Sequence, residues 1–163
     1  MLIIMNKPIK EREILMICTF FGHRDCPADI MPELESVIEN LINNKSVNTF
    51  YVGNNGNFDL YVKNTLQKLS AKYPQIKYTV VFAYIPVKHK NEDYENTLIP
   101  EGIENVPRRF AISYRNKWLV KQADYVVTYI THNYGGAAQF AALAEKKKKI
   151  CINLYKNIQA GKP

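Results

Sequence analysis

Polar, glycine-bearing segments follow three of the most apolar runs of the chain. They begin at Gly22, Gly53 and His132, and each leads into a stretch with helical spacing or small residues. A strand that passes through a glycine loop into a helix exposes backbone N–H groups, which bind anions such as phosphate. Because the carboxyl ends of parallel strands meet at one edge of a sheet, we expect these loops to form one site for a phosphate-bearing ligand.

The loop that starts at Gly53 allows two interpretations. Its Asn55-Gly56 pair suits the type I′ turn of a β-hairpin. However, apolar residues recur at helical spacing over 62–73, and this pattern favours a strand–loop–helix unit. Glycine at 53 and 56 permits positive φ and a close approach to a ligand. The pattern leaves open whether the loop binds phosphate or only turns the chain.

Arginine is the side chain best suited to hold a phosphate, because its guanidinium group forms bidentate hydrogen bonds. Arg115, next to Asn116, lies near the middle of a helix expected over about 107–122. Arg108 shares its face, since seven residues make two helical turns. Such a face can be plain solvated surface, but an arginine in the middle of a packing helix favours a role in binding.

The loop that starts at Gly22 also carries charge. His23, Arg24 and Asp25 follow the first strand-like run, so they are expected at the floor of any pocket. Arg24 could hold a phosphate through charge-assisted hydrogen bonds. The alternative is that Arg24 and Asp25 pair with neighbours on the rim.

A metal site would need partners from several parts of the chain. His23 and Cys26 have a spacing found in metal sites, but a zinc ion needs three or four ligands. His89 and His132 would have to converge with them, so we predict no metal and no cofactor.

Strand-like runs alternate with helical patterns along the chain. Near-continuous apolar runs are typical of strands buried on both faces, and their alternation with helices produces right-handed βαβ units in one parallel sheet. We therefore predict an α/β fold, a three-layer α/β/α sandwich with a mostly parallel five-stranded sheet. The expected strands cover 14–20, 49–52, 78–84, 124–130 and 150–154.

The domain organisation follows from the same pattern. We expect an N-terminal lead-in over 1–13, a single domain over 14–154 and a short C-terminal tail over 155–163. The first helix should begin between Asp29 and Pro32, with Asp29 as its N-cap. The connection over 86–107 is polar and has no clear period, so it is either functional or disordered.

The charge balance favours anionic partners. The formal net charge is +7 and the sequence pI is about 9.2. Part of the excess is the run Lys146–Lys149, whose simplest explanation is a helix C-terminus, where lysines complement the helix dipole. A nucleic-acid patch is the alternative, and we rank it lower.

The cysteine count and the lengths of the apolar runs bear on the cellular compartment and on membrane association. Cys18, Cys26 and Cys151 make an odd count, which argues against a disulfide framework. The N-terminal apolar stretch is too short for a signal peptide, and no run approaches transmembrane length. We therefore expect a cytoplasmic protein that does not act in a membrane.

A family resemblance rests on several of these features together. Arg115-Asn116-Lys117, a strand that begins at Asp124, and a glycine loop before an alanine-rich helix resemble the SLOG superfamily. That group includes the DprA/SMF proteins and the Lonely Guy phosphoribohydrolases. The Gly22-His23-Arg24 turn and the Gly53–Asp59 loop are also similar, so the resemblance covers most of 14–154. It is closest to a bacterial branch of the DUF1273 type, and it implies a Rossmann-like domain that binds a nucleotide or nucleotide-derived ligand.

The resemblance carries over residue by residue. Lonely Guy enzymes have an arginine before the fourth strand, which Arg115 matches, and a Pro-Gly-Gly-x-Gly-Thr-x-x-Glu loop after it. Gly135 matches the third glycine of that loop. His132 and Asn133 stand where the first two glycines would be, and Gly136 replaces the threonine.

The glutamate of that loop becomes Gln139 in this chain. A glutamate can stabilise a developing oxocarbenium ion or act as an acid/base, whereas a neutral glutamine does neither well. A hydrolase would therefore need another carboxylate, for which Asp25, Asp59 and Glu101 are candidates. The resemblance thus favours binding over hydrolysis.

These arguments lead to a ranked set of functions. We expect binding of a nucleotide-derived small molecule; the alternatives are a nucleoside-monophosphate N-glycosidase or deoxyribosyltransferase-like enzyme, and a DprA-like nucleic-acid-binding protein. An enzyme would use Arg115 with Asp25 or Asp59. Related enzymes complete their sites across dimers, and the small face of the last helix suits either a homodimer or packing on the sheet, of which we rank packing on the sheet higher. The predicted ligand contacts are Gly22, His23, Arg24, Gly53, Asn54, Gly56, Arg115, Asn116, Tyr134, Gly135, Gly136 and Gln139.

Overall fold

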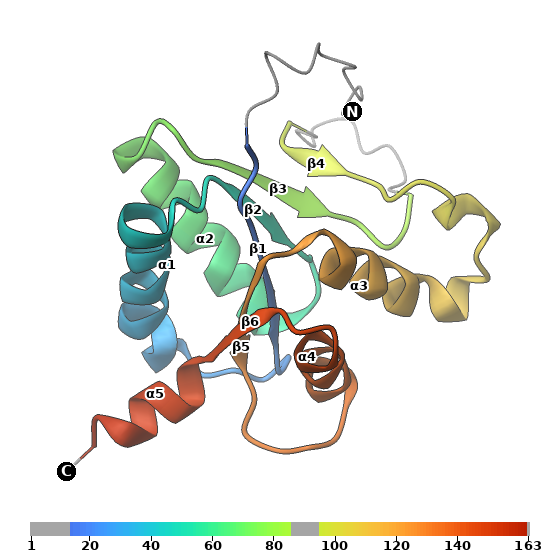
Figure 1. The fold of residues 1–163 in the computed structure, drawn as a ribbon. Coiled ribbons are helices and arrows are strands. Elements are labelled where there is room, and N and C mark those ends of the chain that lie inside the picture. Colours follow the sequence, from blue (N-terminus) through green and yellow to red (C-terminus); the bar gives the residue numbers. More distant parts are fainter. Residues whose placement is uncertain (1–13, 86–94, 163) are drawn as a thin grey trace.

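A single parallel sheet forms the centre of the molecule. The computed structural model describes residues 14–85 and 95–162, so the lead-in expected over 1–13 lies outside the described residues. The strand order across the sheet is β4-β3-β2-β1-β5-β6, and every pair is parallel (Figure 1). The strands are β1 (Ile17–Gly22), β2 (Thr49–Val52), β3 (Lys77–Val81), β4 (Thr97–Leu98), β5 (Tyr125–Tyr129) and β6 (Ile150–Asn153).

Helices cover both faces of this sheet, which confirms the three-layer α/β/α prediction. The helices α1, α2 and α5 pack on one face, and α3 and α4 pack on the other (Figure 1). The α-helices are α1 (Met31–Lys45), α2 (Gly56–Lys72), α3 (Ala111–Gln122), α4 (Gly136–Lys146) and α5 (Leu154–Ala160). Short 3₁₀ turns are η2 (Ala28–Ile30), η3 (Ile103–Asn105) and η4 (Arg108–Phe110).

The central strands divide their side chains between two cores, as the period of a β-strand requires. Phe20 packs into the core beneath α1 and α2, and its neighbour Phe21 packs into the core beneath α3 and α4. Val127 and Val126 of β5 divide in the same way. Both faces of β1 and β5 are therefore buried, which explains their near-continuous apolar sequences.

The prediction of five strands was wrong, because the sheet has six. The extra strand β4 consists of Thr97 and Leu98, which pair with Val80 and Val81 at the edge of the sheet. It lies in the connection expected over 86–107, of which residues 86–94 are outside the described residues. Two residues are too few to show a period of two, so the sequence pattern had no means of marking this strand.

The ends of the domain also differ from the sequence pattern. Where a short tail was expected, residues 154–160 form α5, and Leu154 and Ile158 join the core beneath α1. The first helix begins within the expected range, but Asp29 is not its N-cap. Instead Asp29 lies in η2, and α1 starts at Met31 with no side-chain cap.

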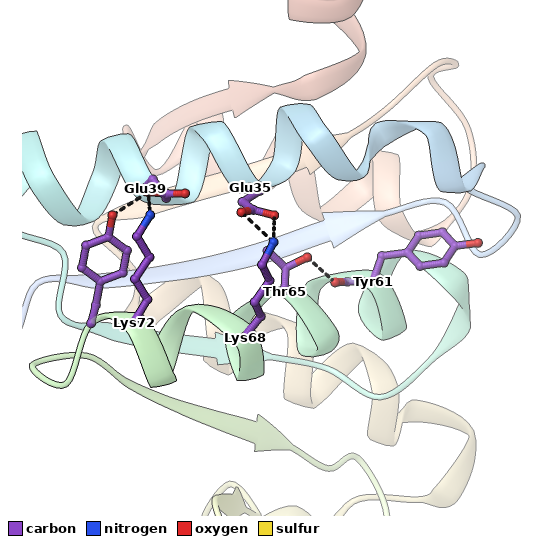
Figure 2. Close-up of polar contacts among 7 residues, drawn as sticks. Glu35, Glu39, Tyr61, Thr65, Lys68 and Lys72 are labelled. Atoms are coloured by element: carbon purple, nitrogen blue, oxygen red, sulfur yellow. Dashed lines mark hydrogen bonds and ion pairs between the residues drawn. The ribbon is translucent and has the colours of Figure 1, made fainter.

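Two ion pairs join α1 and α2 on the surface, as Figure 2 shows. Lys68 contacts Glu35 at 2.9 Å and Lys72 contacts Glu39 at 3.0 Å. The same four-residue step on both helices means that they run in the same direction and in register, as two consecutive βα units require. Tyr73 also donates to Glu39. Exposed pairs of this kind align the helices more than they stabilise the fold.

The order of the strands places a crevice between β1 and β5. The chain builds outward from β1 through β2, β3 and β4, and then returns to the other side of β1 for β5. Gly22 at the end of β1 is in register with Tyr129 at the end of β5. Loops that leave such neighbouring strands in opposite directions open a crevice at the carboxyl edge, which is the usual ligand site of open parallel sheets.

Candidate functional site

A cavity of about 350 Å³ lies at this carboxyl edge. Its wall comes from the loops after β1, β2 and β5, from one face of α3 and from the start of α4. The three glycine-bearing loops of the sequence analysis therefore do meet at one edge. The predicted site residues in the wall are Gly22, His23, Arg24, Asp25, Gly53, Asp59, Arg115, Asn116, Gly135 and Gly136.

Four predicted residues lie outside the wall. Asn54 is exposed, and its Oδ1 accepts a hydrogen bond from Arg115. Gly56 lies against the backbone of Arg24. Tyr134 lies beside the wall on an exposed loop. Gln139 is exposed on α4, so the position that carries a glutamate in the Lonely Guy loop does not face the cavity.

Arg115 is a buried cation held in a fixed position, with only 2% of the residue exposed. Its Nε donates to Asn116 (2.8 Å) and its Nη2 to Asn55 (2.9 Å). Its Nη1 donates to the Val81 carbonyl (2.9 Å) and to Asn54 (3.3 Å). These bonds within the described residues use four of the five N–H donors of a guanidinium group, so one Nη2 donor is left at the cavity wall.

Asp59 provides a negative charge near Arg115, since both side chains approach the Cβ position of Gly53. Its Oδ2 accepts a hydrogen bond from the backbone N–H of Asn55 (2.9 Å), the residue just before α2. Burial raises the pKa of Asp59 to about 6, although the Asn55 N–H and the Arg115 charge act to lower it. In turn, burial lowers the pKa of Arg115, which Asp59 counteracts. A carboxyl group with a pKa near neutrality can serve as an acid or a base.

Gly53 is required by the close approach of these two groups. A Cβ atom at this position would lie 2.7 Å from Asp59 Oδ2 and 3.0 Å from Arg115 Nη1. Gly22 has a similar explanation, because its Cβ would lie 2.2 Å from the Phe58 ring. Packing therefore accounts for both glycines, whether or not a ligand approaches them.

The glycines at the start of α4 are different, because nothing lies within 4 Å of a Cβ atom built at Gly135 or Gly136. Gly135 has φ of 90°, which itself favours glycine, but Gly136 has no positive φ. The space beside Gly136 is thus open on the cavity side of the helix. The first N–H groups of α4 have no intrahelical acceptor, so they are available to an anion there.

Three aromatic rings stack along the edge of the cavity. His23 and His132 are 3.8 Å apart between ring centroids, with an interplanar angle of 15°. His132 and Tyr134 are also 3.8 Å apart, at 16°. His23 Nε2 accepts a hydrogen bond from the Thr131 N–H (3.0 Å), so His23 anchors the β5–α4 loop to the end of β1.

The anchor requires neutral His23, with its proton on Nδ1, because Nε2 is an acceptor. Burial lowers the pKa of His23, His132 lowers it further, and Asp25 opposes both effects. His23 therefore stays neutral to more acidic pH than an exposed histidine.

Asn55 and the stacking role of His132 were not predicted from the sequence. Asn55 lies in the glycine loop after β2, where its polar side chain was a signal that could have marked it as a partner for Arg115. Apolar wall residues were also missed, because Phe20, Phe21, Ile112 and Leu119 read as ordinary core positions. No local pattern predicts that His23 and His132 stack, since they are far apart in sequence.

Metal binding finds no support in the described ranges. No group of three or more His, Cys, Asp or Glu residues in 14–85 and 95–162 is placed to hold a metal ion. His89, considered as a ligand above, lies outside the described residues. Over the same ranges, none of the helices has the length and apolar character needed to cross a membrane.

Comparison with known proteins supports the architecture. No protein-family model matches the chain, and no curated protein matches it. Among solved structures, the chain is similar to DNA processing protein A (DprA) from Streptococcus pneumoniae, with a TM-score of 0.65 and 15% sequence identity. The fold is Rossmann-like. The match covers 90% of this chain but only 57% of that DprA chain, and at this identity it shows the fold alone.

Proposed function

We propose that this chain is a SLOG-like protein that binds a nucleotide or nucleotide-derived, phosphate-bearing ligand at the carboxyl edge of its sheet. The observation that carries the proposal is the guanidinium group of Arg115, which is buried and fixed by Asn54, Asn55 and Asn116 beside an open cavity. A cation that is fixed in this way before the ligand arrives loses little side-chain entropy on binding.

The phosphate would lie between Arg115 and the first turn of α4. Arg115 supplies its remaining Nη2 donor, and the helix supplies free N–H groups and the positive end of its dipole. Arg24 is exposed on the rim and can close over the phosphate. Because Asp25 and Asp59 also line the wall, the formal charges of the two arginines are balanced. This balance favours a ligand with one phosphate over a polyphosphate.

The test uses an amino-acid substitution that should leave the fold intact. Gly136→Val places a side chain in the open space at the start of α4, so folding stability should change little while phosphate binding is lost. Calorimetry and thermal shift with adenosine 5′-monophosphate, ribose 5-phosphate and adenosine measure the effect. Ala142→Val, at an exposed position of the same helix, is the matched control.

We expect the wild type and Ala142→Val to be stabilised by the two phosphorylated compounds and not by adenosine. Gly136→Val should show neither response while keeping its melting temperature. The proposal is wrong if excess phosphorylated ligand stabilises none of the proteins, or if Gly136→Val binds as the wild type does.

A second candidate is an N-glycosidase or transferase acting on a nucleoside monophosphate, and the position of Asp59 favours it. Asp59 lies in the cavity wall near Arg115 with a pKa of about 6, so it can act as a general acid or base in place of the missing glutamate. Release of free base from nucleoside monophosphates would establish the activity. It should be lost in Asp59→Asn, which keeps an acceptor for the Asn55 N–H, and Asp25→Asn tests the other carboxylate.

A third candidate is nucleic-acid binding, which a cationic and aromatic surface at the start of α3 favours. Arg108 lies 4.5 Å from the centre of the Tyr84 ring, and Arg109 lies 4.8 Å from the centre of the Phe110 ring. Phe110 is 51% exposed. Exposed rings beside arginines suit single-stranded nucleic acid. The similar protein is named as a DNA processing protein, although the likeness itself extends only to the fold.

Salt-dependent binding of a fluorescent single-stranded oligonucleotide tests this candidate. Reversal of charge at Arg108 and Arg109 should weaken binding and reduce its salt dependence. Reversal at Lys146 and Lys147, at the end of α4, is the control for general loss of positive charge. Equal effects of the two reversals would indicate nonspecific attraction and reject the surface on α3.

A further inference from the structure

Tyr134 is an exposed aromatic ring on an ordered loop. It is 69% exposed, so its ring contributes little to the hydrophobic core. A tyrosine on a polar loop would normally be free to move among its rotamers, at an entropic cost if it were held. Here the ring lies parallel to His132, and the Tyr134 carbonyl is 3.0 Å from His132 Nδ1.

The stack on His132 and His23 fixes the orientation of the Tyr134 ring. Both His23 and Tyr134 lie 3.8 Å from His132, nearly parallel to it, so they must occupy opposite faces of that ring. The buried end is His23, which is tied to Thr131 by a hydrogen bond. The other end is Tyr134. One face of Tyr134 is therefore covered, and the opposite face forms the free end of the stack.

The stack begins in the cavity wall, and Tyr134 is its outermost ring. His23 and His132 are part of the cavity wall, and Gly135 and Gly136, which follow Tyr134 directly, are part of it too. The space beside both glycines is open. Because Tyr134 directly precedes Gly135, a ligand whose phosphate lies at the first turn of α4 can extend along the β5–α4 loop to the Tyr134 ring.

We propose that the outer face of Tyr134 stacks on the planar heterocycle of the bound ligand, which for a nucleotide is the base. This inference rests on the proposed function, and it names the group that recognises the part of the ligand without phosphate. An aromatic ring stacks on every base, and a purine offers more area than a pyrimidine. Tyr134 thus favours purine over pyrimidine nucleotides without reading the base edge.

The test compares two ligands that differ only by the base. Adenosine 5′-monophosphate and ribose 5-phosphate are titrated by calorimetry into the wild type, Tyr134→Ala and Tyr134→Phe. Tyr134→Ala should lower the affinity for adenosine 5′-monophosphate by about 5- to 150-fold, the range for loss of one base–aromatic stack. Its affinity for ribose 5-phosphate should stay within about twofold of the wild type, which is inside the ordinary variation of a surface substitution.

Tyr134→Phe keeps the ring and should bind both ligands as the wild type does. Ile150→Ala, another exposed large apolar position but at the start of β6, is the matched control and should change neither affinity. In proton NMR spectra, adenosine 5′-monophosphate should shift the ring resonances of Tyr134 to higher field, and ribose 5-phosphate should not.

The outcomes separate this inference from the proposed function. If the wild type binds neither ligand, the proposed function fails and the stacking role fails with it. If both ligands bind but Tyr134→Ala weakens them equally or not at all, the phosphate site stands and the stacking role is overturned. The same holds if the wild type binds adenosine 5′-monophosphate no more tightly than ribose 5-phosphate.

Discussion

At the scale of single residues, the site is built on a buried arginine, Arg115, and the half-buried carboxyl group of Asp59. Both side chains approach the place where Gly53 would carry a Cβ atom, and a Cβ atom there would displace them. The asparagines that follow Gly53 bind the arginine, and the Asn55 backbone binds the aspartate. These polar neighbours thus hold both charged side chains in place at the cavity wall.

The raised pKa of Asp59 predicts how stability changes with pH. The folded-state pKa of about 6 lies above the usual 3.8, so the folded protein binds this proton more tightly than the unfolded chain. The contribution of Asp59 to stability is therefore complete below about pH 3.8 and is lost as the pH rises through about 6. The full difference corresponds to about 3 kcal/mol.

Asp59→Asn removes this titration and keeps a hydrogen-bond acceptor for the Asn55 N–H. We expect it to be more stable than the wild type at pH 8, by up to about 3 kcal/mol, with the gain shrinking toward pH 4. Urea unfolding at several pH values measures this difference. Asp25→Asn, at an exposed carboxylate of the same cavity, is the control. A gain that does not depend on pH would exclude Asp59 as the titrating group.

At the scale of elements, the β5–α4 loop is the part of the site that differs most from an ordinary glycine loop before a helix. It runs from the end of β5 to the start of α4 and is held to β1 by the Thr131–His23 hydrogen bond and by the stack on His132. The Lonely Guy pattern has a glycine at the position of His132, and a glycine cannot stack. This loop therefore combines a helix start whose first N–H groups have no intrahelical acceptor with a stack of aromatic rings.

The loop should detach when His23 becomes protonated. The folded-state pKa of His23 is lowered from 6.5, so the unfolded chain takes up this proton first. Its contribution to stability is complete above about pH 6.5 and is lost as the pH falls through 6.5 to the lower folded-state value. His132, Asp25 and Tyr129 are the neighbours that interact with it.

Amide hydrogen exchange can follow this loop directly. We expect the Thr131 amide to lose protection as His23 titrates, because a protonated Nε2 no longer accepts its hydrogen. The Val127 amide, in the middle of β5, is the internal control and should stay protected. His23→Gln should abolish the pH dependence. Equal loss at Thr131 and Val127 would indicate global unfolding and contradict the local anchor.

At the scale of the whole molecule, the helices on the two faces of the sheet have different roles. The helices α3 and α4 carry Arg115 and the glycine start of the cavity wall, to which the first turn of α2 adds Asp59. The helices α1, α2 and α5 close the larger core. The C-terminal helix α5 belongs to this core, since Leu154 is fully buried in it.

Removal of the Leu154 side chain should therefore destabilise the whole domain. Leu154→Ala is expected to cost about 2–5 kcal/mol, because it leaves a cavity between α5 and the sheet. Gln159→Ala, on the exposed side of the same helix, should stay within about 0.5 kcal/mol of the wild type. Chemical unfolding measures both. A small effect of Leu154→Ala would mean that α5 is a loosely attached tail after all.

Local patterns were enough to predict the alternation of strands and helices, the parallel sheet and the meeting of three glycine loops at its carboxyl edge. Those features follow from local periodicity and from the direction of βαβ units, and Arg115 was recognisable because a buried-type helix position held a cation. Four features became visible only in the folded chain: the two-residue strand β4, the packing of α5, the stack of His23, His132 and Tyr134, and the placement of Gln139 away from the cavity. Each of these depends on contacts between residues far apart in the chain, or on elements too short to show a period.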